Sequence, residues 1–150
     1  MAKRKSLQQD DCPVARAVDL VGDRWSMLIV RDALDGIRRF GDFQRSLGVA
    51  RNILSDRLSA LVEDGLFAIQ PASDGSAYQE YVLTAKGESL FPAIVALRQW
   101  GERHLFAPGE AHSVLIEKDS GKRVSAMQPH DHDGGILKPA RAVVKKVVRK

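Results

Sequence analysis

Arginine side chains gather in one short stretch of the chain, between residues 38 and 57. Five arginines and only two aspartates occur there, together with Asn52 and Ser55. Guanidinium groups bind phosphates through paired hydrogen bonds, and Arg and Asn match the hydrogen-bonding edges of guanine and adenine. These residue types predict nucleic-acid recognition. The alternative interpretation is that the arginines form the solvated face of a helical bundle.

The elements that would position these side chains can be predicted from apolar spacing and from capping and turn residues. Four helices are expected first, one beginning at Pro13 and the others over 24–34, 42–47 and 51–64. Two strands, 66–70 and 78–83, form a hairpin, and a closing helix runs from 85 to about 104 with a bend at Pro92. This order predicts a mainly α fold with a small β-wing, the winged helix-turn-helix.

In a helix-turn-helix, the second helix of the pair enters the major groove with its first residues at the base edges. Helix 51–64 takes that role here. The residues expected to read bases are Arg51, Asn52, Ser55 and Arg57. The residues expected to hold phosphates are Arg38, Arg39, Arg45 and Lys86. Ala50 is a poor N-cap for this helix, so its start depends on other contacts.

The net charge of the chain is unevenly distributed. The 150 residues carry a formal charge of +4, yet residues 12–105 hold 11 basic and 12 acidic side chains. Residues 138–150 hold six basic side chains and no acidic one. The excess therefore lies in a basic tail, and removing 138–150 is expected to lower non-specific DNA affinity while operator preference survives.

Composition and motifs exclude several other classes of protein. The single cysteine, Cys12, rules out an internal disulfide framework, and no apolar run is long enough to cross a bilayer, so a cytoplasmic protein without membrane association is expected. No paired carboxylates, activated nucleophile or glycine-rich phosphate loop points to an enzyme or a cofactor. The string 130–133 holds two histidines and two aspartates, but no third ligand is fixed at helical spacing, so no metal is expected.

Seven short motifs occur in the order and spacing of one known family. The chain resembles HxlR-type transcriptional regulators, a branch of the MarR-like winged-helix proteins, over residues 12–105. The motifs are Cys12-Pro13-Val14, Gly22-Asp23-Arg24-Trp25, Arg39-Phe40 with Asp42-Phe43, Leu54-Ser55-Asp56-Arg57-Leu58, Gly65-Leu66, Tyr81-Val82-Leu83-Thr84 with Lys86-Gly87, and Trp100-Gly101-Glu102.

The resemblance implies a homodimer that binds operator DNA and regulates transcription, as a repressor or an activator. It places the dimer contact on the first and last helices of the domain, at Val14, Val18, Ile94, Leu97 and Trp100. The chain departs from the family in having Ala50-Arg51 where a Ser-Pro pair is usual. It also has no Lys or Arg between Arg57 and Lys86, so the wing is expected to gain little from phosphates.

Two interpretations of Cys12 stay open. The cysteine precedes Pro13 at a helix start, where the helix dipole favours a reactive thiolate, and members of the resembled family use such a residue to sense oxidants or electrophiles. The other interpretation is a small residue packed in the dimer contact. A small-molecule effector in a cavity lined by Trp25 and Trp100 is a further expectation, although both are interpreted first as core and dimer aromatics.

The expected organisation is an N-terminal arm (1–11), a DNA-binding and dimerisation domain (12–106) and a C-terminal extension (107–150). The extension is expected to form a hairpin from strands 114–117 and 123–127, followed by the basic tail. The alternative function is a winged helix that only binds other proteins, with the extension as its docking surface. The near-neutral charge of residues 12–105 keeps that alternative open.

Overall fold

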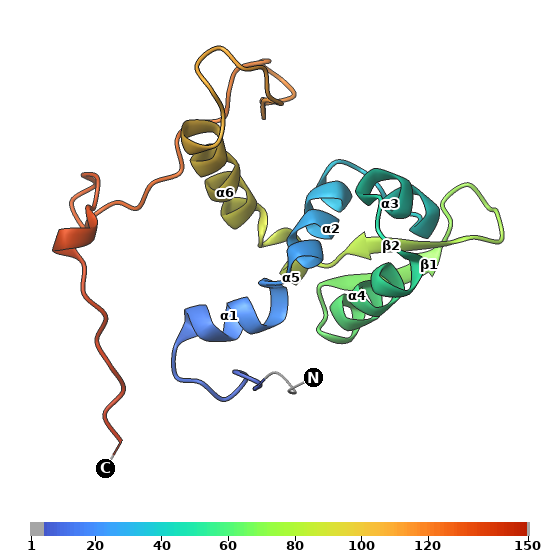
Figure 1. The fold of residues 1–150 in the computed structure, drawn as a ribbon, viewed down its shortest axis with the longest axis horizontal. Coiled ribbons are helices and arrows are strands. Elements are labelled where there is room, and N and C mark those ends of the chain that lie inside the picture. Colours follow the sequence, from blue (N-terminus) through green and yellow to red (C-terminus); the bar gives the residue numbers. More distant parts are fainter. Residues whose placement is uncertain (1–4, 150) are drawn as a thin grey trace. The chain divides into compact units, whose positions relative to one another are not determined.

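The computed structural model describes residues 5–149 and divides the chain into two units, 1–91 and 92–150. Residues 1–4 and 150, which belong to the expected N-terminal arm and basic tail, lie outside the described residues. The helices of the first unit are α1 (Pro13–Val21), α2 (Arg24–Leu34), α3 (Phe40–Leu47), α4 (Arg51–Glu63) and α5 (Ala85–Glu88), and its strands are β1 (Phe67–Pro71) and β2 (Gln79–Leu83) (Figure 1).

Helix α2 is the central element of the first unit. It packs against α3, α4 and β2, and α4 also packs against β1. Ile29 of α2 and Leu58 of α4 are completely buried, and the ring of Phe43 meets that of Phe67 edge to face, with centroids 6.4 Å apart. The apolar stripes predicted from the sequence therefore form one core between the helices and the hairpin.

The helix ends follow from local chemistry. The Asp23 carboxylate accepts the backbone N–H groups of Trp25 and Ser26 and so caps α2. Gly48 ends α3 in the left-handed conformation, with φ of 61°. Ala50 offers α4 no side-chain cap, as predicted.

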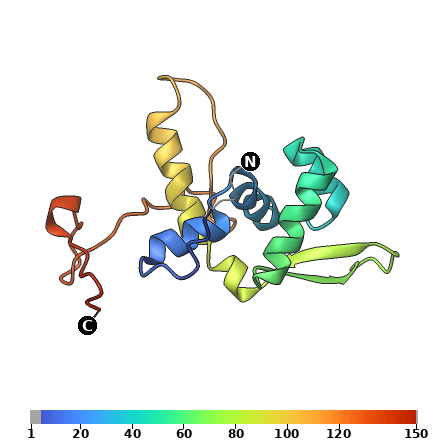
Figure 2. The ribbon, with the colours of Figure 1, turned by 60° about the horizontal axis from the view of Figure 1, so that its bottom comes forward.

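The β-hairpin pairs β1 and β2 antiparallel, from Phe67 opposite Leu83 to Pro71 opposite Gln79. Its turn projects beyond α3 and α4 in both ribbon views (Figures 1 and 2). This hairpin is the wing, and the predicted mainly α fold with a small β-wing is confirmed.

The closing helix is divided in two, and the prediction of one continuous helix was wrong in this respect. Helix α5 ends at Glu88 and α6 (Phe91–His104) begins three residues later. Pro92 has no N–H to donate and its ring would clash with the carbonyl group four residues earlier, which belongs to Glu88. The proline therefore breaks the helix instead of bending it.

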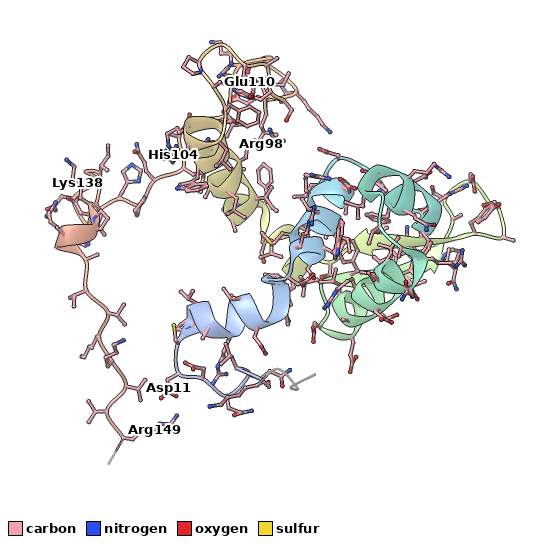
Figure 3. The ribbon with its side chains drawn as sticks, viewed as in Figure 1. Asp11, Arg98, His104, Glu110, Lys138 and Arg149 are labelled. Atoms are coloured by element: carbon pink, nitrogen blue, oxygen red, sulfur yellow. The ribbon has the colours of Figure 1, made fainter. Side chains whose placement is uncertain are left out.

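The second unit combines α6 with a long irregular segment. Arg98 donates to the carbonyl and hydroxyl oxygens of Ser113, and Gln99 bonds the backbone of Ser125 and of Met127, so that residues 113–127 lie along α6 (Figure 3). The strands predicted at 114–117 and 123–127 are reduced to an isolated bridge between Ile116 and Arg123. The predicted turn between them is present, closed by the Glu117 N–H and the Lys122 carbonyl at 2.8 Å.

A second turn follows at 130–136, then the short 3-10 helix η1 (Pro139–Arg141). From Ala142 to Arg149 the described chain has neither helix nor strand. No helix among residues 5–149 has the length and apolar character needed to span a membrane.

Replacing Gly87 by Ala should destabilise the first unit. A Cβ at this position would lie 2.2 Å from the Leu66 carbonyl oxygen and 2.8 Å from Leu83 Cδ2, so α5 and the hairpin would have to separate. Such overpacking costs about 1–3 kcal/mol, measurable by urea unfolding. The matched control is Gly41→Ala in α3, where the nearest atom is the mobile end of Arg45 at 3.5 Å. Equal stability of the two variants would contradict the close approach.

Candidate nucleic-acid interface

A concave surface lies where α3, the start of α4 and the wing meet. Its volume is 840 Å³. Polar, basic and aromatic side chains line it, in an arrangement suited to a polar, anionic partner. The lining residues are Arg39, Phe40, Gly41, Asp42, Gln44, Arg45, Arg51, Ser55, Ala77, Tyr78, Gln79 and Tyr81.

The first turn of α4 presents the predicted base-reading residues to solvent. Arg51, Asn52 and Ser55 are exposed, while Leu54 and Leu58 of the same helix are buried. The Arg51 guanidinium lies 5.2 Å from the centre of the Phe40 ring, a cation–π contact that supports it from α3 and leaves its N–H groups available. Among residues 5–149, no carboxylate forms an ion pair with Arg51.

Arg45 lies on the last turn of α3 and its side chain is 75% exposed. It forms an ion pair with Asp42 one turn earlier on the same helix. Exposed pairs of this kind are weak, so the guanidinium can exchange the aspartate for another anion at little cost.

Arg39 is held by the wing. Its guanidinium bonds the Asp74 carboxylate, lies 3.4 Å from the Ser76 hydroxyl and stacks on the Tyr78 ring at 5.0 Å. All three partners belong to the turn of the hairpin or to the residue just before β2. The start of α3 and the tip of the wing are therefore connected through one arginine.

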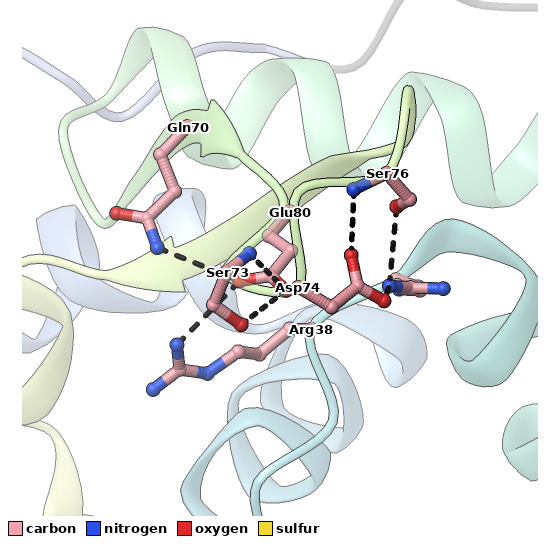
Figure 4. Close-up of polar contacts among 7 residues, drawn as sticks. Arg38, Gln70, Ser73, Asp74, Ser76 and Glu80 are labelled. Atoms are coloured by element: carbon pink, nitrogen blue, oxygen red, sulfur yellow. Dashed lines mark hydrogen bonds and ion pairs between the residues drawn. The ribbon is translucent and has the colours of Figure 1, made fainter.

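Arg38 makes a second connection to the same hairpin, through Glu80 (Figure 4). Glu80 is only 4% exposed, and its carboxylate accepts the N–H and hydroxyl groups of Ser73 at 3.1 and 3.0 Å and an amide N–H of Gln70 at 3.5 Å. Arg38 lies 3.5 Å from the other side of this carboxylate, and its carbonyl accepts the Tyr81 N–H at 2.7 Å.

These contacts hold both wing carboxylates in the charged form. The backbone and side chain of Ser76, followed by Arg39, lower the pKa of Asp74 to about 2. The backbone N–H of Ser73 is the largest cause of a lowered pKa at Glu80, and it acts against burial, which would raise that pKa. Both connections between wing and α3 therefore persist as ion pairs at neutral pH.

Helix α4 is attached to the neighbouring elements in its middle and at its C-terminal end. Arg57, in the middle of α4, lies 3.5 Å from the Asp23 carboxylate that caps α2. Burial alone would raise the pKa of Asp23, but hydrogen bonds from Ser26 and the charge of Arg57 outweigh it, so this pKa is lowered. At the C-terminal end, Lys86 Nζ donates to the Asp64 carbonyl oxygen at 2.8 Å, just beyond the last turn of α4.

The structure brings together four of the eight residues predicted to bind DNA, Arg39, Arg45, Arg51 and Ser55, around the concave surface. Asn52 is exposed on the same turn of α4 as Arg51. Arg38, Arg57 and Lys86 do not line this surface and bond groups of the chain itself. Sequence reasoning missed Asp74, Tyr78 and Glu80, since nothing in the spacing of the wing residues indicates which arginine each one meets.

The other residues singled out in the sequence lie outside this surface. Cys12 is exposed and precedes the first residue of α1. Of the residues predicted for dimerisation, Val14 and Val18 on α1 are exposed, as are Leu97 and Trp100 on α6, while Ile94 is half-buried. Within residues 5–149, the histidines and carboxylates of 130–133 are not part of any cluster of three metal-ligating side chains.

Three helices, a helix-turn-helix pair among them, followed by a two-stranded wing define the winged helix-turn-helix class of protein. The chain belongs to the HxlR-like helix-turn-helix family, whose pattern it matches over residues 20–108. It is 52% identical over 95 residues to the uncharacterized HTH-type transcriptional regulator Rv3095 of Mycobacterium tuberculosis. That match covers 63% of this chain and 60% of the relative, so more than a third of the relative lies outside it.

Solved structures extend the similarity beyond the helix-turn-helix. The crystal structure of PA1607, a proposed transcription factor, is 52% identical, with a TM-score of 0.89 over 94% of this chain and 99% of that one. The C-terminal extension is therefore largely shared with PA1607. The redox regulator HypR in its oxidized form is 28% identical, with a TM-score of 0.58 over 64% of this chain and 100% of that one.

The hydrogen bonds that Asp74 accepts from Ser76 and Arg39 predict that this wing carboxylate stays charged at low pH. The pKa of Asp74 is about 2, below the usual 3.8. The charge of Asp74 therefore stabilises the fold fully at pH values above 3.8, and this contribution is lost as the pH falls towards 2. Titration followed by carboxyl NMR should give a midpoint near 2, and Arg39→Gln should raise it. Arg45→Gln is the matched control and should leave the midpoint where it was. An unchanged midpoint in Arg39→Gln would show that Arg39 does not hold the carboxylate in solution.

Proposed function

We propose that this protein is a transcriptional regulator that binds an operator in double-stranded DNA as a homodimer. The observation that carries the proposal is the exposed first turn of α4, where Arg51, Asn52 and Ser55 stand beside the concave surface. These side chains offer donors and acceptors that match base edges in the major groove, and the helix lies where a recognition helix lies in this class of fold.

The predicted DNA contacts divide into two groups by their present partners. Arg51 has no carboxylate partner among residues 5–149 and Arg45 pairs only with Asp42 on its own helix, so they are available to a base and to a phosphate, respectively. Arg38, Arg39 and Arg57 each have an acidic partner in the chain, so DNA would have to share or displace it. We assign these three first to positioning the wing and α4, and only second to DNA contact.

Lys86 has a similar double role. Its ammonium group holds the last carbonyl groups of α4 through Asp64, and it has two further N–H donors, which suit a phosphate. The wing brings aromatic and amide groups, Tyr78 and Gln79, to the concave surface instead of cations. Affinity in this unit therefore rests on α3 and α4 more than on the wing.

The dimer contact is proposed on α1 and α6, in agreement with the family. Val14 is 68% exposed on α1, and Leu97 and Trp100 are 57% and 52% exposed on α6. Apolar side chains that are this exposed on helices mark surfaces for association, and two-fold symmetry would make each copy present the same patch. A dimer would read two half-sites about one helical turn apart.

Base reading by α4 and phosphate binding by α3 should respond differently to substitution. An operator is first selected from a random duplex library, and a near-palindromic sequence is expected. Arg51→Ala should then lower the preference for that operator over a scrambled duplex by roughly 5- to 150-fold, because a bidentate base contact contributes about 1–3 kcal/mol of discrimination. Arg45→Gln should weaken both duplexes alike and reduce the salt slope by about one for each copy, or about two for the dimer.

Lys122→Gln, in the extension, removes the same charge outside the interface and is the control. If no sequence is enriched by the full chain, or if both variants bind like the control, the proposal is wrong. The protein-binding alternative would then gain support.

We also propose that oxidants modulate DNA binding through Cys12. Its exposed thiol is the single cysteine of the chain, so a protein disulfide can form only between two copies. Diamide would take up two electrons and two protons from two such thiols as the S–S bond forms. The likeness to a redox regulator, HypR, supports this assignment.

Diamide is therefore expected to change the operator affinity of the full chain and to produce a covalent dimer on a non-reducing gel. Cys12→Ser should abolish both effects, and a reducing agent should reverse them in the unsubstituted chain. Identical binding with and without diamide in the unsubstituted chain would remove Cys12 from the proposed function.

A further inference from the structure

The end of the chain carries the densest positive charge in the molecule. Residues 138–150 hold six basic side chains and no acidic one. Every described residue from Lys138 to Arg149 is exposed. This charge does not belong to the helix-turn-helix, and the proposed interface makes no use of it.

Hydrogen bonds attach the start of the basic segment to the turn that precedes it. Asp131 accepts the backbone N–H groups of Asp133 and Gly135 and pairs with Arg141 at 3.2 Å. These bonds join the turn at 130–136 to the 3-10 helix η1. Asp131 therefore partly neutralises Arg141.

Residues 142–149 have neither helix nor strand, and we call them the basic arm (142–149). Lys145 and Lys146 form no ion pair with any residue in the described part of the chain. Val143 is 94% exposed and Val148 is 87% exposed, so these side chains gain almost nothing from packing on their own chain. No carboxylate therefore offsets the repulsion between the two neighbouring lysines.

We propose that the basic arm binds the phosphate backbone of the same duplex that the helix-turn-helix reads. The inference rests on the proposed function and deepens it. Duplex DNA carries one negative charge per about 1.7 Å of axis, which complements a segment with cations and no acid. Extended at about 3.3–3.6 Å per residue, the eight residues 142–149 reach roughly 27 Å, or about eight base pairs.

The arm supplies affinity without sequence preference, because lysine contacts to phosphates carry no base information. It thereby supplements a first unit whose arginines are largely paired with carboxylates. Each phosphate contact contributes about 0.9 to the dependence of log affinity on log salt. Two lysines per copy, and so four in the proposed dimer, should therefore account for a salt slope of about 3.6.

The test compares the full chain with the double variant Lys145→Gln, Lys146→Gln. The matched control is Lys118→Gln, Lys122→Gln, which removes two exposed charges from the turn at 117–122. Affinity for the selected operator and for a scrambled duplex of equal length is measured between 50 and 200 mM salt. Sedimentation velocity gives the oligomeric state of each protein.

The expected result is a salt slope lower by about 3.6 for the dimer on both duplexes, with the ratio between operator and scrambled DNA unchanged and the control like the full chain. Operator preference with an unaltered slope would overturn the inference and leave the proposed function standing. A change in oligomeric state with an unaltered slope would also overturn it, since the arm would then bind a second copy. If the salt slope falls in the double variant but no protein prefers the operator, phosphate binding by the arm is supported and the proposed function is refuted.

Discussion

The geometry of the candidate interface depends on one buried carboxylate. Glu80 lies on β2, almost inaccessible to water, and a buried carboxylate is tolerated only when hydrogen bonds and a cation satisfy it. Ser73 and Gln70 supply bonds from the hairpin, and Arg38 supplies the cation from the connection before α3. The requirement to satisfy this one group thus attaches the wing to α3. The next residue, Arg39, repeats the attachment through Asp74 at the exposed tip of the turn.

This arrangement gives the arginines of the first unit two functions that compete. An arginine that holds the wing next to α3 shapes the concave surface, but its positive field is reduced by the carboxylate it binds. Residues 12–105 are nearly neutral because their acidic side chains offset their basic ones. In the proposed function, discrimination between bases falls to the first turn of α4, where Arg51 lies on an aromatic ring, and general attraction to phosphates falls to residues outside the unit. A low background charge is an advantage for a reader of sequence, since it limits binding to random DNA.

The sequence predicts those parts of the fold that depend on local periodicity and local caps. Helix α2 was predicted with the observed bounds, because Asp23 caps it and its apolar stripe has helical spacing. The hairpin strands were found within a residue for similar reasons. The break at Pro92 was underestimated, because a proline near the start of a helix and one inside it look alike in sequence. The bond between Arg39 and Asp74 joins residues 35 positions apart, and no local pattern encodes it. Half of the predicted DNA contacts therefore have structural partners that only the tertiary fold reveals.

Contacts with neighbouring elements orient helix α4, which lacks a side-chain cap of its own. Ala50 gives it no cap, so its first turn lacks the usual side-chain acceptor. The helix is held instead by Leu54 and Leu58 in the core, by Arg57 on the cap of α2, and by Lys86 at its last carbonyl groups. Each of these contacts lies away from the exposed edge of the first turn. In the proposed function, orientation and recognition are thus separated on one helix, and the amide groups left without a cap are open to water or to a phosphate of bound DNA.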